Sequence, residues 1–203
     1  MRKILEKILI TLLLSLTIFL SACSTGPVVL EPGPINLVAP EDEGADKWSL
    51  WIESVKDSRE APAPNWFGEL DNRFSDEISL VSMKPAPADY YREHLSRMLL
   101  SMGVEASSRA AAKVYLDVDI LKFRAYRDTS AAMDFLTVEL DSKVKFTRAG
   151  GKVLGTTTIP VVRTLKIPVG RAESIENLVR KAVIDTLDGL KESEIFKEAI
   201  GKK

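Results

Sequence analysis

Cysteine and histidine are almost absent from this sequence of 203 residues, which contains one of each, Cys23 and His94. A single cysteine excludes a disulfide framework and a cysteine-rich zinc site. A single histidine removes most catalytic triads and most metal sites, which combine several such side chains. The sequence also has almost no net charge, because it contains 28 Lys and Arg and 29 Asp and Glu. That balance argues against a nucleic-acid binder, which needs a basic surface.

The first residues have the pattern of a secretory signal. A basic start is followed by an uncharged run from Ile8 to Leu20 and then by small residues, which is typical of a cleaved signal peptide. The run is shorter than the roughly 20 apolar residues of a transmembrane helix, so spanning is the weaker interpretation. Leu20-Ser21-Ala22-Cys23 looks like a bacterial lipobox, in which the cysteine is lipidated and becomes the first mature residue. A buried or chance cysteine is the alternative.

Lipidation of Cys23 by diacylglycerol and acyl (palmitate) chains predicts a lasting membrane anchor, since each buried CH₂ contributes about 0.8 kcal/mol. By similarity to outer-membrane lipoproteins, Ser24 rather than Asp after the cysteine implies sorting to the outer membrane. The domain would then face the periplasm of the cell envelope. Apart from this covalent lipid, the sequence predicts no cofactor.

Residues 24–46 are rich in proline and glycine and contain the acidic run Glu41-Asp42-Glu43. This composition disfavours regular elements. We therefore predict a signal peptide over residues 1–22, a lipidated flexible tether over 23–46 and a single domain over 47–203. The tether would reach about 75 Å when extended. An irregular arm lying on the domain is the alternative.

Hydrophobic periodicity predicts five strands and three helices in the domain. The strands are expected at 48–55, 77–83, 114–124, 136–148 and 152–166, and the helices at 88–102, 175–190 and 193–200. The alternation of apolar and polar residues shifts by one position at Ile120-Leu121, which predicts a β-bulge. Gly150-Gly151 predicts a hairpin turn. The result is an α+β fold, an antiparallel sheet with helices on one face, in a two-layer sandwich of order β-β-α-β-β-β-α-α.

Four caps are expected at the helix ends. Asp89 and Ser174 are suited to begin helices, and Gly103 is suited to end one in a left-handed conformation. Ser193 is expected to cap the short final helix. Pro160 should place its strand at an edge or a bulge.

Several of these features together resemble the YajG family of bacterial lipoproteins. They are the lipobox, the Asp57-Ser58-Arg59 segment after the first strand, the helix that ends at Gly103, the glycine hairpin and the Ile175 to Leu190 helix. The resemblance implies a compact domain at the outer membrane and supplies no catalytic residues. The layout is also distantly similar to auxiliary lipoproteins of lipid transport and to the N-terminal domain of the Tol-Pal protein TolB. Both are partner-binding modules, so the analogy favours binding over catalysis.

The candidate functional residues are Arg59, Trp66 and Phe67. Arg59 follows Asp57 closely and could pin the loop through an ion pair, or it could contact an anion or a partner. Trp66 and Phe67 follow a proline-rich loop and could plug the core or anchor an interface. We predict no catalytic and no metal-binding residues.

His94 is expected at the surface or at the boundary of the core, because no nucleophile or orienting carboxylate accompanies it in the sequence. The four carboxylates Asp117, Asp119, Glu139 and Asp141 could share one sheet face. With Lys143 and Lys145 beside them, a solvated face of mixed charge is expected rather than a Ca²⁺ site.

The sequence therefore predicts a non-enzymatic, lipid-anchored lipoprotein of the outer membrane that binds an envelope protein or supports envelope assembly. An auxiliary lipoprotein of lipid or lipopolysaccharide transport is the alternative. That alternative is favoured by an exposed apolar strip near Trp66 and Phe67, and disfavoured by a closed core between the helices and the sheet. An enzyme is the least favoured class.

Overall fold

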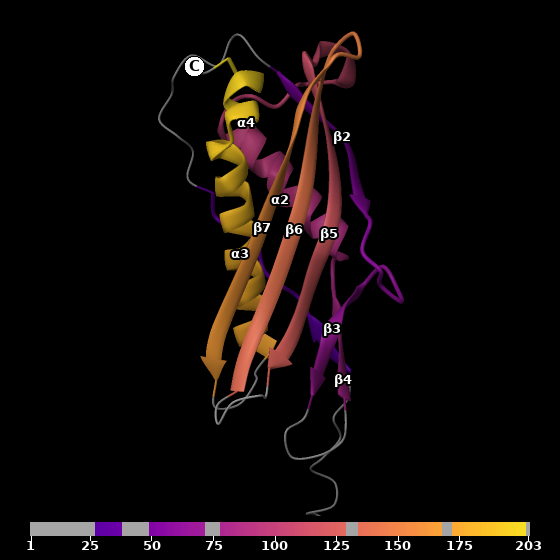
Figure 1. Cartoon of the computed structure of the whole chain (residues 1–203), viewed down its shortest axis with the longest axis vertical. Coiled ribbons are helices and arrows are strands. Elements are labelled where there is room, and N and C mark those ends of the chain that lie inside the picture. Colours follow the sequence, from indigo (N-terminus) through magenta and orange to yellow (C-terminus); the bar gives the residue numbers. More distant parts are fainter. Residues whose placement is uncertain (1–26, 38–48, 72–77, 129–133, 168–171, 202–203) are drawn as a thin grey trace, which may run out of the picture.

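Three long strands form the centre of the molecule in the computed structural model, which describes residues 27–37, 49–71, 78–128, 134–167 and 172–201. β5 (Val114–Asp128), β6 (Asp134–Arg148) and β7 (Val153–Ile167) follow one another as an antiparallel meander (Figure 1). Alternate residues of β5 and β6 point into the core, as their period of two predicts. They include Leu116, Val118, Ile120, Leu140, Val144 and Phe146, all buried.

Two local features of this meander confirm the predictions from the sequence. The register of β5 against β6 shifts between Ile120 and Lys122, which is the expected bulge. Ile120 and Phe123 are consequently both buried, while Leu121 between them is 41% exposed. Gly150 and Gly151 turn the chain at φ angles of 103° and 88°, which a residue with a Cβ rarely adopts.

Four shorter strands complete a seven-stranded sheet. They are β1 (Val28–Leu30), β2 (Leu50–Asp57), β3 (Trp66–Asp71) and β4 (Ile78–Met83). The order is β1-β4-β3-β5-β6-β7, and β2 also pairs with β5. β7, which carries Pro160, lies at an edge as expected.

The sheet is mixed, whereas a wholly antiparallel sheet was predicted. β3–β4, β5–β6 and β6–β7 are antiparallel, but β1–β4, β2–β5 and β3–β5 are parallel. Parallel pairing requires a crossover connection, and the chain between β2 and β5 contains the helix α2 (Pro87–Ser101). The predicted order of elements also lacked β1 and β3, which are short and adjoin proline-rich segments.

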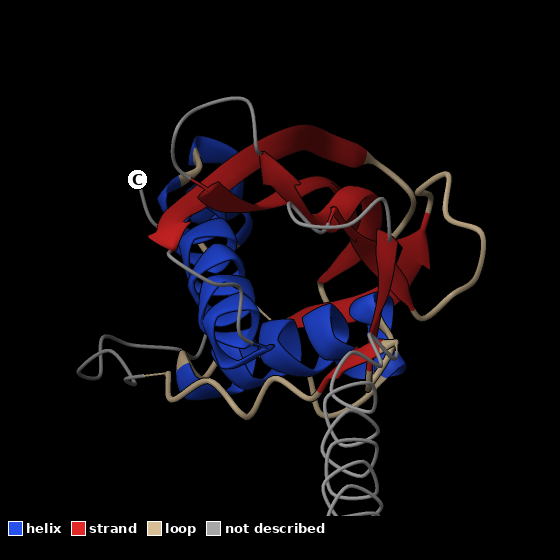
Figure 2. Ribbon diagram, turned by 90° about the horizontal axis from the view of Figure 1, so that it is seen from below, coloured by secondary structure: helices blue, strands red, loops and turns tan. Residues whose placement is uncertain are grey.

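Helices cover the concave face of the curved sheet, so the predicted two-layer α+β class is confirmed. Seen end-on, the sheet curls round and α2 and α3 (Ala172–Glu192) close its open side (Figure 2). The apolar stripes of both helices are buried against the strands. They include Tyr91, Leu95 and Leu99 on α2, and Val179, Val183 and Leu187 on α3. The short α4 (Glu194–Ala199) packs beside α3.

The helix ends follow the sequence in part. Gly103 ends α2 with φ +65°, as predicted, and the hydroxyl of Ser193 accepts a hydrogen bond from a backbone N–H of α4. The predicted caps Asp89 and Ser174 are wrong. Pro87 occupies the first turn of α2 without a side-chain cap, and α3 begins before Ser174.

Residues 27–37, called the N-terminal arm below, belong to the folded domain. β1 pairs with β4, and Leu30 and Ile35 are buried in the core. The arm therefore departs from the predicted tether and follows the alternative of a packed segment, and the domain begins well before residue 47. The signal peptide, Cys23 and the rest of the predicted tether lie outside the described residues. None of the described helices is both long and apolar enough to cross a membrane.

Candidate functional site

The strand β5 changes neighbours along one of its sides. β2 pairs with it as far as Ile120, and β3 pairs with it from Ala125 onward, while β6 follows its other side. We call the gap between the two neighbours the sheet fork, made of β5 residues 121–124 and the loop 58–65. Backbone groups in such a gap need other partners, because a buried carbonyl without a hydrogen bond is costly.

Arg59 provides those partners at the sheet fork. Its Nε and Nη2 donate hydrogen bonds to the two carboxylate oxygens of Asp57, each at 2.7 Å. Nη1 donates to the carbonyl oxygens of Trp66 at 2.9 Å and Phe123 at 2.7 Å. Nη2 also donates to the carbonyl of Pro64 at 3.3 Å. The five N–H groups of a guanidinium are thus all engaged within the chain.

The charge of Arg59 also determines the state of Asp57. Burial raises the pKa of Asp57, but the hydrogen bonds and the positive charge from Arg59 outweigh that effect and leave the pKa below its ordinary value. The side chain of Arg59 is 4% exposed. The structure therefore shows Arg59 in the loop-pinning ion pair, the first of the two roles considered for it from the sequence.

Phe67 is fully buried, as the core-plug alternative predicted. Its ring packs edge-on against Phe123, with 5.0 Å between the ring centroids. It plugs the core and offers no surface to a partner. Trp66, expected in a loop, begins β3 and stays partly exposed. Of the three candidate residues, only Trp66 remains available for contact.

Gly68 lets β3 approach β5 closely. Its φ is +156°, and a Cβ built on it would lie 1.8 Å from the carbonyl oxygen of Ala125. No side chain fits at that distance. The fork therefore depends on a glycine at this position.

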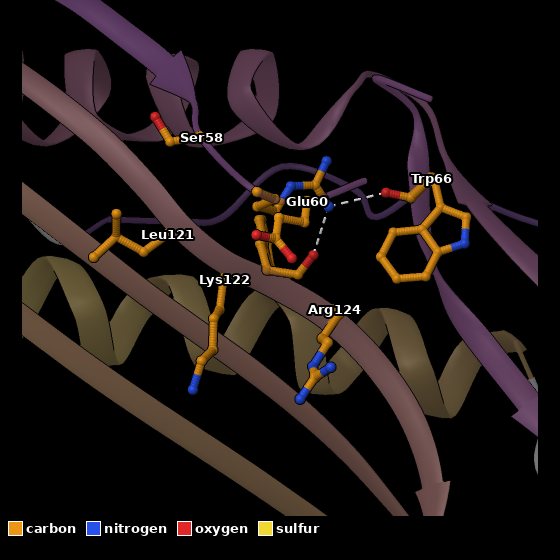
Figure 3. A pocket seen from close by; sticks show the side chains of 8 residues that line it. Ser58, Glu60, Trp66, Leu121, Lys122 and Arg124 are labelled. Atoms are coloured by element: carbon orange, nitrogen blue, oxygen red, sulfur yellow. Dashed lines mark hydrogen bonds between the residues drawn. The ribbon is translucent and has the colours of Figure 1, made fainter. Parts of the chain in front are cut away.

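A pocket of ≈ 360 Å³ opens at the sheet fork (Figure 3). Its lining combines residues of the loop, of β3 and of the bulge in β5: Ser58, Arg59, Glu60, Trp66, Leu121, Lys122, Phe123 and Arg124. In the view of Figure 3, Leu121 and Trp66 lie on opposite sides of the pocket, with Glu60 between them. The bulge positions Leu121, because it turns both Leu121 and Lys122 outward.

Charged side chains form the rim of this pocket on the β5 side. Lys122 pairs with Asp141 at 3.3 Å and Arg124 pairs with Glu139 at 3.0 Å. The guanidinium of Arg124 also lies over the ring of Tyr126, 5.4 Å from the ring centroid. The pocket therefore has an apolar wall and a rim of both charges, an arrangement that suits a side chain of a partner protein.

The solvent-facing carboxylates of the sheet are balanced by basic neighbours. Asp117 pairs with Lys145 at 3.4 Å, and Asp119 lies opposite Lys143 in the ladder. Glu139 and Asp141 are engaged by the two basic residues of the pocket rim. This face thus has the mixed charge that the sequence predicted. In the described residues, no three His, Cys, Asp or Glu side chains converge on a possible metal position.

His94 is buried inside the fold, and the prediction of a surface or boundary position is wrong. Its Nε2 accepts a hydrogen bond from the backbone N–H of Ile35 at 3.0 Å, and its Nδ1 lies 2.7 Å from the carbonyl of Tyr90. These bonds are consistent with the neutral tautomer protonated on Nδ1. Burial lowers the pKa of His94. The hydroxyl of Tyr90 donates to the carbonyl of Gly33 at 3.1 Å, so α2 holds the N-terminal arm at two points.

Sequence reasoning missed the N-terminal arm and the role of His94. The apolar run Val28-Val29-Leu30 is the signal for β1 that the surrounding prolines concealed. No local pattern reveals the bond between His94 and Ile35, which lie 59 residues apart. The spacing of Tyr90 and His94 places both on one face of α2, which is a weak signal for a shared partner.

Comparison with known proteins gives a fold relationship. No protein-family model matches the sequence, and no curated protein sequence matches it. A crystal structure of a Xanthomonas campestris protein assigned to the DUF330 family is similar, with a TM-score of 0.61 at 12% identity, over 80% of this chain and 91% of that chain. A minor lipoprotein from Acinetobacter baumannii has a TM-score of 0.43 at 14% identity, over 56% of this chain and 87% of that chain.

The similarity to the Xanthomonas protein shows a shared fold over most of both chains. The chain therefore has the α+β architecture of a bacterial DUF330 protein. At this level of identity, activity and partners do not carry over. The resemblance to the YajG family stays a prediction from the sequence.

Proposed function

We propose that this chain is a bacterial lipoprotein, anchored by lipid on Cys23 in the outer membrane, with a periplasmic domain that binds an envelope protein without catalysing a reaction. The observation that carries the proposal is the position of Cys23. The lipobox-like Leu20-Ser21-Ala22-Cys23 ends a signal-like run and stands just before β1, which begins at Val28. Membership of the YajG family is part of this proposal.

The non-catalytic part of the proposal is supported by the chain's single histidine. Both ring nitrogens of His94 face backbone atoms of Ile35 and Tyr90, so the usual acid–base group is engaged in holding the fold together. Arg59 is engaged in the same way at the sheet fork. The residue types that would first be suspected of catalysis or anion binding therefore have structural roles.

The pocket at the sheet fork is the proposed contact with the envelope protein. Leu121 offers an exposed apolar side chain across the pocket from Trp66, and Lys122, Arg124 and Glu60 add both charges to the lining. A buried apolar or aromatic anchor within a polar rim is the usual anatomy of a protein interface.

The test is a pull-down of the lipidated protein in mild detergent, with bound proteins and lipids identified by mass spectrometry. We expect one stoichiometric envelope protein, lost in Leu121→Asp and retained in Leu100→Asp, a matched control on the exposed side of α2. Equal capture by both variants would overturn the assignment of the pocket. Retention of Cys23→Ser in the membrane fraction would overturn the lipid anchor.

An auxiliary lipoprotein of lipid or lipopolysaccharide transport is the second candidate. It is favoured by three exposed apolar residues, Ile78 and Leu80 on β4, which pairs with β3 at Trp66, and Val29 on β1 beyond it. It is disfavoured by the packing of α2 and α3, whose apolar stripes are buried in the core among the described residues. Phospholipid or lipopolysaccharide retained beyond the anchor in the same pull-down would favour this candidate.

A further inference from the structure

An exposed apolar strip lies on the outer face of β1 and β4. Its members, Val29, Ile78 and Leu80, are 53%, 56% and 54% exposed. Val29 stands opposite Ser82 in the ladder, and residues 78, 80 and 82 share one face of β4 because strand residues alternate. The opposite face of the same two strands is buried in the core. We call these three residues the β1–β4 strip.

The direction of β1 places this strip near the start of the mature chain. β1 runs parallel to β4, with Val28 opposite Val81. Because β4 begins at Ile78, the chain before Val28 leaves the sheet toward the end where Ile78 lies. Figure 1 shows β3 and β4 together at one end of the molecule.

The remaining distance to Cys23 is short. Only residues 24–27 separate Cys23 from β1, and five Cα–Cα steps span at most about 17 Å. The predicted tether of about 75 Å would have let the domain hang free of the membrane. With the arm packed in the fold, a lipid on Cys23 would stay within this reach of the first residue of β1.

We propose that the β1–β4 strip rests on the lipid surface that holds the Cys23 lipid, so that this edge of the sheet faces the bilayer. The inference depends on the proposed lipid anchor. Exposed apolar side chains held within reach of a bilayer interface gain from insertion among the headgroups and upper acyl chains. Glu69, which pairs with Leu80 across the strands, is exposed and marks the side of the strip that stays solvated. The strip thereby orients the domain, while the anchor retains it.

The test uses the full lipidated protein in vesicles of phosphatidylethanolamine and phosphatidylglycerol. Lipidation blocks the thiol of Cys23, so a fluorophore attaches to one introduced thiol, at Ser82→Cys beside the strip or at Thr158→Cys on β7 as a control. Nitroxide-labelled lipids report proximity to the bilayer, and iodide reports exposure to water. We expect lipid quenching of the label at 82 to be several-fold stronger than at 158.

A second variant separates the strip from the anchor. Val29→Asp with Leu80→Asp should abolish the excess quenching at 82 while the protein still floats with the vesicles. Excess quenching that persists in this variant would overturn the proposal, and so would a label at 82 that only iodide reaches. A label at 82 that neither quencher reaches would indicate a second copy on the strip and would also overturn it. If the lipidated protein without these substitutions failed to float with the vesicles, the lipid anchor itself would be refuted.

Discussion

Replacing Arg59 is the most direct test of the sheet fork. Arg59→Ala would leave the carboxylate of Asp57 partly buried without its partner, and the carbonyls of Trp66 and Phe123 without their donor. Removing one partner of a buried, hydrogen-bonded ion pair costs about 3–5 kcal/mol. Arg59→Lys keeps the charge but has a single donor atom, which is unable to serve the carboxylate and the carbonyls together. We expect about 1.5–3 kcal/mol for that change.

The assay is urea unfolding at pH 7, followed by far-UV circular dichroism, on a soluble form that starts at Ser24. The matched control is Arg97→Ala, which breaks a pair with Glu93 on α2 whose side chains are 45% and 47% exposed. Such an exposed pair contributes about 0.3–0.5 kcal/mol. A midpoint shift with an unchanged m-value identifies a stability change. If Arg59→Ala lost no more than Arg97→Ala, the account of the fork would be refuted.

The pH dependence gives a second check on the same pair. The folded pKa of Asp57 lies below its ordinary value of 3.8. Its contribution to stability is therefore fully present above that value and is lost as the pH falls through the folded pKa. In Arg59→Ala, burial alone remains and favours the protonated acid. The difference in unfolding free energy between the two proteins should shrink on acidification below about pH 4.

Three further predictions concern the arm and the fork. A form that starts at residue 47 should unfold at a lower urea concentration than one that starts at residue 27. The reason is the loss of two buried side chains of the arm, which contribute about 3–6 kcal/mol to the free energy of unfolding. Equal urea midpoints would show that the arm does not stabilise the domain. The lowered pKa of His94 means that stability falls as the pH drops below about 6.5 and through the folded pKa. Its single histidine resonance should titrate below the ordinary value of 6.5, and His94→Gln should remove the pH dependence of stability. Gly68→Ala should destabilise by several kcal/mol, on the order of a core defect, whereas Gly33→Ala, whose added Cβ meets its nearest atom at 3.9 Å, should be tolerated.

Features with a local physical cause could be predicted from the sequence. The alternation in β5 and β6, the stripe on α2 and the turn at Gly150 each depend on neighbours in the chain. The bulge at Leu121 could be predicted because a one-residue shift in the apolar alternation within a strand has few structural explanations other than a bulge. The pair of Asp57 and Arg59 was foreseeable for the same reason, since the two residues are two positions apart.

The missed features depend on contacts between distant parts of the chain. β1 is three residues long and is stable only because β4 and the core receive it. His94 is buried only because Ile35 reaches it from the N-terminal arm. The further donors of Arg59 find their acceptors only where β3 and β5 meet. Hydrophobic periodicity contains no information about contacts between distant parts of the chain. Arg59, which looked available for a partner, therefore proved to hold the fold together.

The bulge offers a way to separate fold from function at the fork. Deleting Leu121 would make the pairing of β5 with β6 regular and would keep Ile120 and Phe123 on the buried face, because Lys122 alone would then point outward. The deletion would remove the apolar wall of the pocket opposite Trp66. We expect a folded protein, with strand-rich circular dichroism and cooperative unfolding, that no longer captures the envelope protein. A deletion variant that fails to fold would show that β5 needs the bulge in order to pair with both β2 and β3. A folded variant that still captures the protein would place the contact elsewhere.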